Sequence, residues 1–498
     1  MEKDNNVSSS DVKLDYRIRL GETLEVQDGD SLAISPSESR EVLRKIDFCV
    51  IPLMGFCYLL QYMDKLALSS ATLLGLLRDL DLHGSQYSWC SAIFYFGYLT
   101  WSWPSSYLIV RFPTGKYIAM TVCLWGGVLM CHGAVHDFGG LMAARFFLGV
   151  GEAAVAPGFA LITGMFYTRK EQPLRQGAWF AGNSLANIFG GLVAYGIGQI
   201  QTSSLADWRL LFLILGGITS AYAFVLYLFL PDSPDKAVFL DEKQQQIALR
   251  RTIETKTGLL DNDNFVPNQV IDALTDPPLW LLVLYTVSVN LANGGLTSFG
   301  ALVIKGFGFS DLKALLIQMP IGVSQLIFLL LTSSFATLLP SARLVLMIIN
   351  TLTSMVGMTM VYECKGRAAR MAGLCLASVF AANVPLSLSL ISSNVGGFTK
   401  RSVTSATLFV AYCVGNIAGP QFFQSSQAPR YPTGLRASLS GLAFGTWFLA
   451  CLRVYYLCEN ARRNKRYGQS QRLSVHEALR EDLSGKTDQQ LPDFRYVI

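Results

Sequence analysis

Long apolar runs recur along the whole chain and restrict what it can fold into. A membrane-spanning helix needs about 20 largely apolar residues, and twelve such runs can be marked in the 498 residues. Only 15% of the residues are charged, whereas soluble globular domains carry roughly 25%. We therefore predict an all-α membrane protein with twelve transmembrane helices. The runs cover residues 46–66, 87–110, 117–135, 139–159, 177–199, 210–230, 279–304, 314–338, 344–361, 371–391, 403–423 and 439–457.

A polar stretch divides the runs into two groups of six. It contains the segments DEKQQQIALRR and DNDN, whose polarity is typical of a loop outside the membrane. The N-terminal residues lack the apolar core of a signal peptide and have the composition of a disordered tail. The predicted parts are a cytosolic disordered tail (1–45), an N-terminal six-helix bundle (46–230), a cytosolic linker (231–278), a C-terminal six-helix bundle (279–457) and a cytosolic tail (458–498).

The two halves resemble each other in sequence. The segment SLANIFGG (184–191) in the fifth run is similar to CVGNIAGP (413–420) in the eleventh. At a constant offset, Phe180, Asn187, Ile188 and Gly190 match Phe409, Asn416, Ile417 and Gly419. Two six-helix halves related by an axis along the membrane normal are typical of the major facilitator fold.

Basic residues indicate the orientation in the membrane. Lys and Arg divide about evenly between the short loops of the two sides, but three basic clusters fall on one side if there are twelve spans. Basic flanks stay in the cytosol, so we expect both termini and the linker there. The clusters are Arg40, Arg44 and Lys45; Lys236, Lys243, Arg250 and Arg251; and Arg462, Arg463, Lys465 and Arg466.

Composition argues against several other classes of protein. The net charge of +5 is small for the length and sits mostly in tails and loops, which gives nucleic-acid binding little support. The ten cysteines are scattered singly and the four histidines do not cluster, so we predict no metal site, no disulfide framework and no cofactor.

Two opposite charges lie in the fourth run, in the stretch RFFLGVGEAAVAPG. Arg145 and Glu152 are seven residues apart, which places them within about 20° of each other on a helix. A charge at the bilayer centre costs roughly 3 kcal/mol and is tolerated beside a partner or a cavity. Gly149 leaves space on the same stripe. The pair either fastens the fourth span to the first or lines a transport path.

In the transport interpretation, Arg145 binds a substrate carboxylate and Glu152 carries the proton. Side chains lean toward the helix N-terminus, so a direct bond between the two is expected to be weak. A substrate anion on Arg145 screens that charge, and Glu152 then takes up a proton as the anion binds.

The first run ends with an acid and a base, in YMDKLAL. Asp64 lies in the outer half of the span, is a candidate to line the transport path and contact the substrate, and is a plausible partner for Arg145. We expect the neighbouring Lys65, about 100° further round the helix, to extend toward the membrane surface.

Side-chain amides occur in several runs. We select Asn183, Asn187 and Asn293 as candidate substrate ligands; the alternative is that such amides bond one helix to another. Asn293 is favoured because the adjacent Gly294 and Gly295 can break the helix and expose backbone at the midplane. Further amides are Asn290, Gln318, Gln325 and Asn383.

An ordered series of motifs resembles the fungal allantoate permease family, anion:cation symporters of the major facilitator superfamily. The resemblance begins near Lys45 and reaches the C-terminus. It implies uptake of small organic anions, usually with protons: allantoate, ureidosuccinate, nicotinate, pantothenate and other carboxylates. We expect a monomer in the plasma membrane. The motifs are RFFLGVGEAAVAPG (145–158), LPDSPDKAVFL (230–240), NGGLTSFG with IKGFGFS (293–310), SNVGGFTKRSVTSA (393–406), VGNIAGPQFF (414–423), APRYPTG (428–434) and DFRYVI (493–498).

Residues at the cytosolic face are predicted to be structural or gating groups rather than ligands. The loop YLIVRFPTGK (107–116) keeps Gly115 and Lys116 of a superfamily pattern but has Phe112 and Pro113 where an acid–base pair is usual. A gating salt bridge from this loop is therefore not expected. Lys400 and Arg401 are assigned to the same class.

Three other functions stay open at this point. An enzyme is disfavoured because the chain has no HExxH, no P-loop and no Ser/His/Asp grouping. A nutrient sensor on a transporter fold is disfavoured because the tail after the last span is only about 40 residues long, counted from the span lengths that a bilayer requires. A proton-driven exporter of a carboxylate is the strongest rival, because sequence does not fix the direction of flux.

Overall fold

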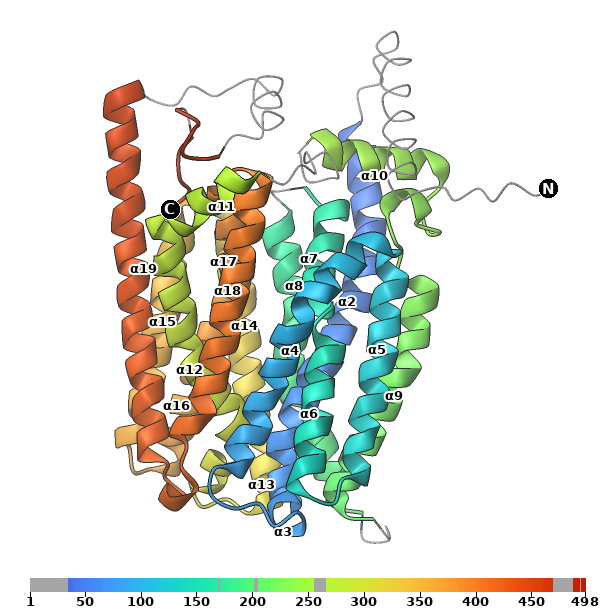
Figure 1. Cartoon of the computed structure of the whole chain (residues 1–498), viewed down its shortest axis with the longest axis vertical. Coiled ribbons are helices and arrows are strands. Elements are labelled where there is room, and N and C mark those ends of the chain that lie inside the picture. Colours follow the sequence, from blue (N-terminus) through green and yellow to red (C-terminus); the bar gives the residue numbers. More distant parts are fainter. Residues whose placement is uncertain (1–34, 169–170, 201–204, 255–265, 469–486, 493) are drawn as a thin grey trace, which may run out of the picture.

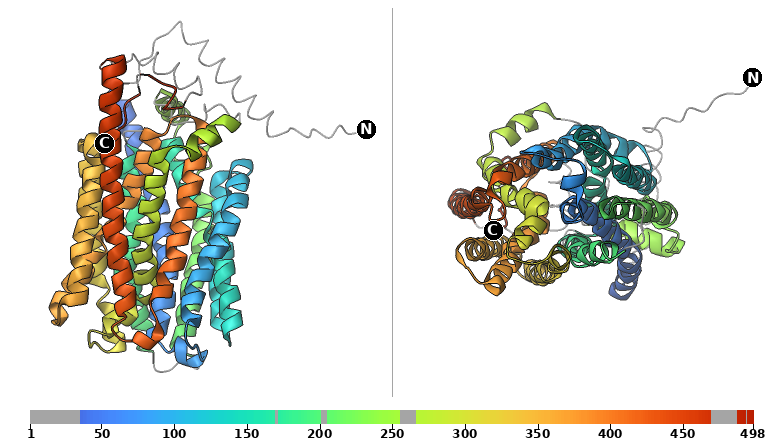
Figure 2. Two further views of the ribbon diagram at one scale, coloured as in Figure 1. Left: turned by 60° about the vertical axis from the view of Figure 1, so that its left-hand side comes forward. Right: turned by 90° about the horizontal axis from the view of Figure 1, so that it is seen from below.

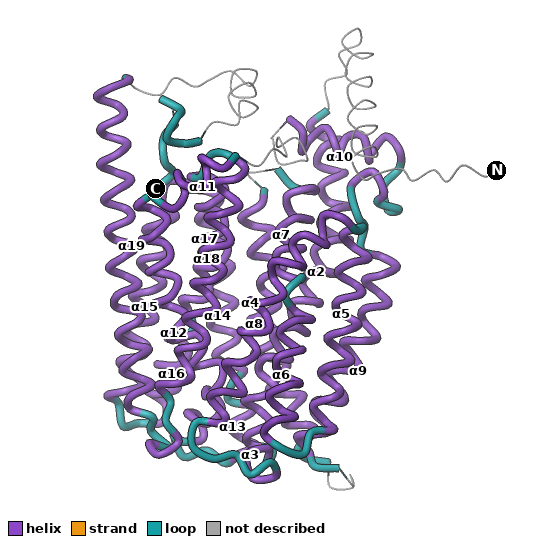
Figure 3. The backbone as a smooth tube through the Cα atoms, viewed as in Figure 1, coloured by secondary structure: helices purple, strands orange, loops and turns teal. Residues whose placement is uncertain are grey.

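The computed structural model describes residues 35–168, 171–200, 205–254, 266–468, 487–492 and 494–498. Within these ranges every regular element is a helix (Figure 3). The first half contains α2 (Pro36–Leu73), α3 (Leu76–Asp79), α4 (Gln86–Arg111), α5 (Thr114–Cys131), α6 (Phe138–Glu152), α7 (Val155–Phe166), α8 (Gln172–Ile197) and α9 (Asp207–Phe229). The linker contains α10 (Glu242–Glu254) and α11 (Pro267–Leu274). The second half contains α12 (Pro277–Lys305), α13 (Asp311–Leu316), α14 (Met319–Leu338), α15 (Arg343–Glu363), α16 (Arg367–Ala377), α17 (Asn383–Asn394), α18 (Phe398–Ala418) and α19 (Pro432–Tyr467).

The long helices lie side by side in two groups (Figures 1 and 2). Ten helical segments of the described chain are long and apolar enough to cross a membrane. The less apolar α4 and α8, each 26 residues long, run beside them (Figure 1). Together these segments correspond to the twelve predicted spans, and the predicted all-α fold is confirmed. We call the helices α2–α9 the N-bundle and the helices α12–α19 the C-bundle.

The start of α2, both linker helices and the C-terminus lie at the same end of the molecule (Figure 1). We call it the linker end, and the opposite end, which carries α3 and α13, the far end. The linker helix α10 is fastened to α2, where Lys243 pairs with Glu38 at 2.6 Å. It is also fastened to the segment before α8, where Arg251 pairs with Glu171 at 2.6 Å.

Helical structure extends beyond several predicted boundaries. The first helix begins at Pro36, within the predicted disordered tail, because Ser35 accepts a hydrogen bond from the backbone of Ser37 and proline suits the first turn. It also runs on to Leu73. The last helix continues to Tyr467, ten residues beyond the predicted end of its span. The rest of the predicted N-terminal tail, residues 1–34, lies outside the described residues.

Three spans are interrupted, two of them near the middle and the eighth near its start. A proline cannot donate to the carbonyl four residues earlier, which weakens the helix at that point. The interruptions fall at residues 153–154, at residues 317–318 and in the 3₁₀ turn Val379–Ala382, and they are followed by Pro157, Pro320 and Pro385. Pro52 and Pro104 lie inside α2 and α4, which stay continuous. Proline therefore permits a break without forcing one.

The two bundles touch most closely along α8 and α14. A Cβ atom at Gly191 would collide with the carbonyl oxygen of Leu315, and one at Gly322 would lie 2.6 Å from the carbonyl oxygen of Ser184. Nearer the linker end, Gly177 packs equally closely on the Ser333 hydroxyl. Small residues allow such backbone contact between membrane helices. We call this contact the α8–α14 seam.

Candidate functional site

Four charged side chains gather inside the N-bundle. Asp64 and Lys65 come from α2, and Arg145 and Glu152 come from α6. Asp64 and Glu152 are fully buried, Arg145 is 3% exposed and the Lys65 side chain is 10% exposed. Burying charges in an apolar interior is costly unless they are paired, so this charge cluster requires an explanation.

Lys65 is the ion-pair partner of Glu152, with 3.5 Å between its Nζ atom and a carboxylate oxygen. The ammonium also lies over the rings of Phe94 and Tyr98, 5.3 and 5.5 Å from their centroids. The expectation that Lys65 extends to the membrane surface is therefore wrong. The helix continues to Leu73, so Lys65 lies two turns inside it instead of at its end.

Arg145 is held by weaker contacts. Its Nε atom donates to the carbonyl oxygen of Cys90 at 3.3 Å, and its guanidinium lies 5.1 Å from the centroid of the Phe94 ring. One terminal nitrogen, Nη1, is buried without a hydrogen-bond partner. Arg145 and Glu152 are both fully described, and no ion pair joins them. The backward lean of side chains along a helix accounts for this separation.

Asp64 faces a tryptophan rather than Arg145. The indole N–H of Trp125 on α5 donates to Asp64 Oδ2 at 2.6 Å, and Oδ1 is buried without a hydrogen-bond partner. The suggested ion pair between Asp64 and Arg145 is absent from this conformation. The spacing of residues in the sequence does not indicate this charge-assisted bond, because Asp64 and Trp125 come together only in the folded chain.

A cavity of about 70 Å³ lies between the two bundles. Four amides line it: Asn187 on α8, Asn293 on α12, Gln318 between α13 and α14, and Gln325 on α14. The share of one water in the liquid is about 30 Å³, so this space suits one small polar group. Gln318 is 6% exposed and its Nε2 has no hydrogen-bond partner, which leaves a donor available at the cavity.

The two asparagines predicted on α8 differ in role. Asn187 Nδ2 donates across the bundle interface to Gln325 Oε1 at 3.0 Å and to the backbone carbonyl of Asn183 at 3.2 Å. Asn183 does not line the cavity, although its Oδ1 atom is buried without a hydrogen-bond partner.

Asn293 lines the cavity, but the helix around it does not break. Its Nδ2 atom donates to Asn416 Oδ1 at 2.8 Å, and α12 is continuous from Pro277 to Lys305. The prediction that Gly294 and Gly295 open the helix is wrong. Both glycines are buried packing positions: a Cβ at Gly294 would lie 2.7 Å from the carbonyl oxygen of Asn416. Glycine is needed here for close approach of α18, not for a turn.

The middle of the C-bundle is built on neutral hydrogen bonds. The amide of Asn383 donates to the hydroxyl groups of Tyr285 and Thr351 at 3.1 and 3.0 Å and to the carbonyl of Met347 at 3.1 Å. Its Oδ1 atom accepts from Asn350 at 2.9 Å. The sequence shows these residues only as scattered amides, and their convergence depends on the packing of α12, α15 and α17.

The three residues assigned to gating lie at the linker end and contact their own bundle. The backbone N–H groups of Gly115 and Lys116 donate to Asp232 at 3.0 and 3.3 Å, which ties the first turn of α5 to the segment after α9. Lys400 is 1% exposed. Arg401 donates from Nε to the carbonyl of Val395 at 3.3 Å.

Comparison with known proteins identifies a family. The model of the Major Facilitator Superfamily matches residues 54–420. Allantoate permease of Saccharomyces cerevisiae is 32% identical, covering 98% of this chain and 90% of the permease. An uncharacterized transporter of Schizosaccharomyces pombe is 36% identical, covering 96% of this chain and 89% of that protein. The Thiamine pathway transporter THI73 of Saccharomyces cerevisiae is 29% identical, covering 92% of this chain and 86% of that protein.

The fold also matches solved structures. A bacterial homologue of the human lysosomal transporter Spinster, in an inward-facing and unoccupied conformation, has a TM-score of 0.54 at 14% identity. The match covers 85% of this chain and 97% of that chain. At this identity the likeness concerns the fold alone.

Proposed function

Because the chain belongs to the allantoate permease family of the major facilitator superfamily and is a membrane transporter, we propose that it imports a small organic anion together with protons. The observation that carries this proposal is the charge cluster in the N-bundle. Two acids and two bases sum to zero when all four are ionised, and Asp64 and Arg145 each have a buried polar atom without a hydrogen-bond partner. The charges of the cluster therefore balance, but some of its polar atoms have no hydrogen-bond partner.

A carboxylate that enters this cluster changes its balance. With Lys65 and Arg145 as its ligands, the site holds one negative charge in excess. An uncompensated carboxylate in an apolar interior takes up a proton rather than stay ionised. Glu152 is the group that loses its partner when the substrate occupies Lys65, since these two side chains are paired in the empty site. Binding of the anion and uptake of the proton are coupled in this way.

The cavity between the bundles offers a place for the neutral part of the substrate. Gln318 presents an unused donor there, and Asn187, Asn293 and Gln325 supply further amides. Hydrogen-bonding sites discriminate strongly against analogues that lack the matching group. We infer a carboxylate that also carries a neutral polar group. Allantoate, nicotinate and pantothenate are the candidates to test first.

Transport driven by an imposed pH gradient in lipid vesicles tests the proposal. We expect at least one of these labelled acids to accumulate, by about tenfold per pH unit if one proton accompanies each monovalent anion. Glu152→Gln should abolish accumulation but keep exchange of substrate across the membrane, because glutamine preserves shape and cannot ionise. The exposed Glu363→Gln is the matched control. If Glu152→Gln still concentrates substrate with unchanged pH dependence, the proton carrier is another group.

The same vesicles separate the rival functions. An exporter would drive substrate out of the cytosolic compartment under the physiological gradient, and a sensor would bind an acid without moving it. Competition by matched acid and amide pairs tests the charge of the substrate. If an amide competes for uptake as well as its acid does, the transporter does not require a carboxylate and that part of the proposal is wrong.

Orientation is proposed from the basic clusters. With the linker end in the cytosol, the hydrogen bonds between the bundles at the far end close the path on the outside: Tyr87 to the carbonyl of Ser298 at 2.5 Å, and Ser91 to the Ser298 hydroxyl at 2.6 Å. A cysteine introduced at Ser233 should resist membrane-impermeant thiol reagents in intact cells. The exposed native residues Cys123, Cys131 and Cys458 must be replaced first. Clear labelling at position 233 would mean that the proposed orientation is wrong.

A further inference from the structure

The last residues of the chain fold onto the linker end of the C-bundle. We call residues 487–492 and 494–498 the clasp. Thr487 and Asp488 are fully buried and Tyr496 is 5% exposed, which is unusual for a chain terminus. The prediction of a cytosolic tail placed this segment outside the bundles, and residues 494–498 of the DFRYVI motif belong to it.

Asp488 anchors the clasp to a buried lysine. One carboxylate oxygen lies 2.8 Å from Lys400 Nζ, and the same ammonium is 2.6 Å from Asp276 at the start of α12. The other carboxylate oxygen of Asp488 accepts from the Tyr496 hydroxyl at 2.8 Å. Burial and the neighbouring Asp488 carboxylate raise the pKa of Tyr496, so this hydroxyl remains a donor at physiological pH.

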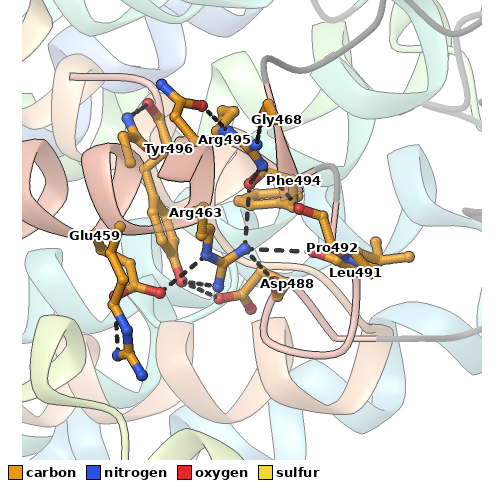
Figure 4. A network of polar contacts seen from close by, with 12 residues as sticks. Glu459, Arg463, Gly468, Asp488, Leu491, Pro492, Phe494, Arg495 and Tyr496 are labelled. Carbon is orange, nitrogen blue, oxygen red and sulfur yellow. Dashed lines mark hydrogen bonds and ion pairs between the residues drawn. The ribbon is translucent and has the colours of Figure 1, made fainter. Parts of the chain in front are cut away.

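Arg463 on α19 donates hydrogen bonds to the backbone of the clasp at several points (Figure 4). Its Nη1 atom donates to the carbonyl oxygens of Asp488, Leu491 and Phe494 at 2.9, 3.4 and 3.1 Å. Its guanidinium also lies 5.0 Å from the centroid of the Tyr496 ring. One buried cation therefore satisfies three carbonyls of a segment that has no helix or strand to satisfy them.

The clasp also holds the end of α17. The amide of Asn394, the last residue of α17, donates to the carbonyl of Val497 at 2.8 Å and accepts from the Val497 N–H at 2.7 Å. The interruption at Val379–Ala382 separates α17 from α16, and α17 packs against α8 of the N-bundle. A short helix behind a break is fixed mainly by what it touches at its other end.

We propose that the clasp acts as a conformational latch that sets the position of α17 and thereby controls opening of the path at the linker end. The docked clasp joins α12, α17, α18 and α19 into one unit through Asp276, Asn394, Lys400 and Arg463. Its release frees α17 to move about the break while the rest of the C-bundle stays folded. Lys400 then keeps Asp276 as its counter-charge.

Hydrogen–deuterium exchange on the purified full chain tests this without knowledge of the substrate. In Asp488→Asn, we expect backbone exchange in Asn383–Asn394 to rise about tenfold, since a bond to a charged group is lost. Asp241→Asn, the same change at an exposed aspartate of the linker end, should leave it unchanged. Exchange in α5 should be equal in all three proteins.

A milder variant distinguishes a local effect on α17 from general destabilisation of the fold. Tyr496→Phe removes one hydroxyl but keeps the ring stacked on Tyr456, with 4.7 Å between the centroids, so it should raise exchange in α17 by a smaller factor. The proposal is overturned if exchange in α17 stays at the wild-type level in both variants. It is equally overturned if α5 exchange rises together with that of α17, because the clasp would then support the whole fold rather than one helix.

Discussion

The interiors of the two bundles differ in kind. Four ionisable side chains occupy the middle of the N-bundle, whereas the middle of the C-bundle is held by amides and hydroxyls centred on Asn383. The charged residues of the clasp region, such as Lys400 in the first turn of α18, pair instead with Asp276 and Asp488. In the function we propose, this difference gives the halves separate tasks: the N-bundle responds to charge, and the C-bundle offers neutral hydrogen bonds.

Two asparagines at matching positions show how the halves differ. Asn187 and Asn416 match in the sequence repeat, and each donates to the carbonyl four residues earlier, at 3.2 and 2.8 Å. Asn187 then reaches Gln325 of the other bundle, while Asn416 bonds Asn290 within its own bundle at 3.0 Å. The same local structure serves contact between bundles in one half and packing within the bundle in the other.

The largest effect is expected from breaking the charge balance of the N-bundle. Lys65→Met leaves Glu152 without its partner, and removing one member of a buried pair costs about 3–5 kcal/mol of stability. Thermal unfolding of the purified protein measures the loss. Lys305→Met is the control, since it breaks an exposed pair with Asp311 that is worth about 0–1 kcal/mol.

The double variant Lys65→Met/Glu152→Gln sharpens this test. It removes both charges, and we expect it to recover most of the lost stability. A double variant as unstable as Lys65→Met would mean that the methylene stem and packing of Lys65 matter, not its charge.

An intermediate effect is expected when one buried arginine is changed in each half. Arg145→Lys loses the planar fork that suits a carboxylate and should weaken substrate affinity by about 1–3 kcal/mol. Arg343→Lys alters a buried arginine that donates to the Ser393 hydroxyl at 2.6 Å, and affinity should hardly change. Uptake at equal surface expression measures both. If both variants lose the same amount of substrate affinity, recognition of the substrate's charge does not belong to the N-bundle alone.

The smallest effect is expected at the bond between the bundles. Gln325→Leu removes the acceptor of Asn187, and such bonds between membrane helices contribute about 0.6 kcal/mol. The ratio of outward- to inward-open states, measured by single-molecule fluorescence, should shift by about threefold. Asn290→Leu removes a bond within the C-bundle, and we expect no shift of this ratio. A shift of equal size there would contradict the distinction between the two asparagines.

The sequence predicted the spans and the family well because both depend on apolar run length and ordered local motifs. Arg145 and Glu152 were found because a charge in an apolar run is conspicuous. The pairing of Lys65 was missed because it depends on where α2 ends and on rings supplied by α4. The continuity of α12 at Gly294 was missed because glycine permits both a break and close packing, and only the neighbouring helix decides between them. The clasp has no apolar periodicity to reveal it.

The α8–α14 seam has a consequence for how such a molecule moves. Backbones that already touch near Gly191 and Gly322 leave no room for one helix to pass over the other. Sliding requires carbonyls to pass through glycine Cα positions, and separation gives up the close packing that the small residues allow. Rotation of one bundle about this line of contact has neither effect. We therefore expect the bundles to rotate about the α8–α14 seam, and we expect an added methyl group at Gly322 to impede that rotation even where the binding site is preserved.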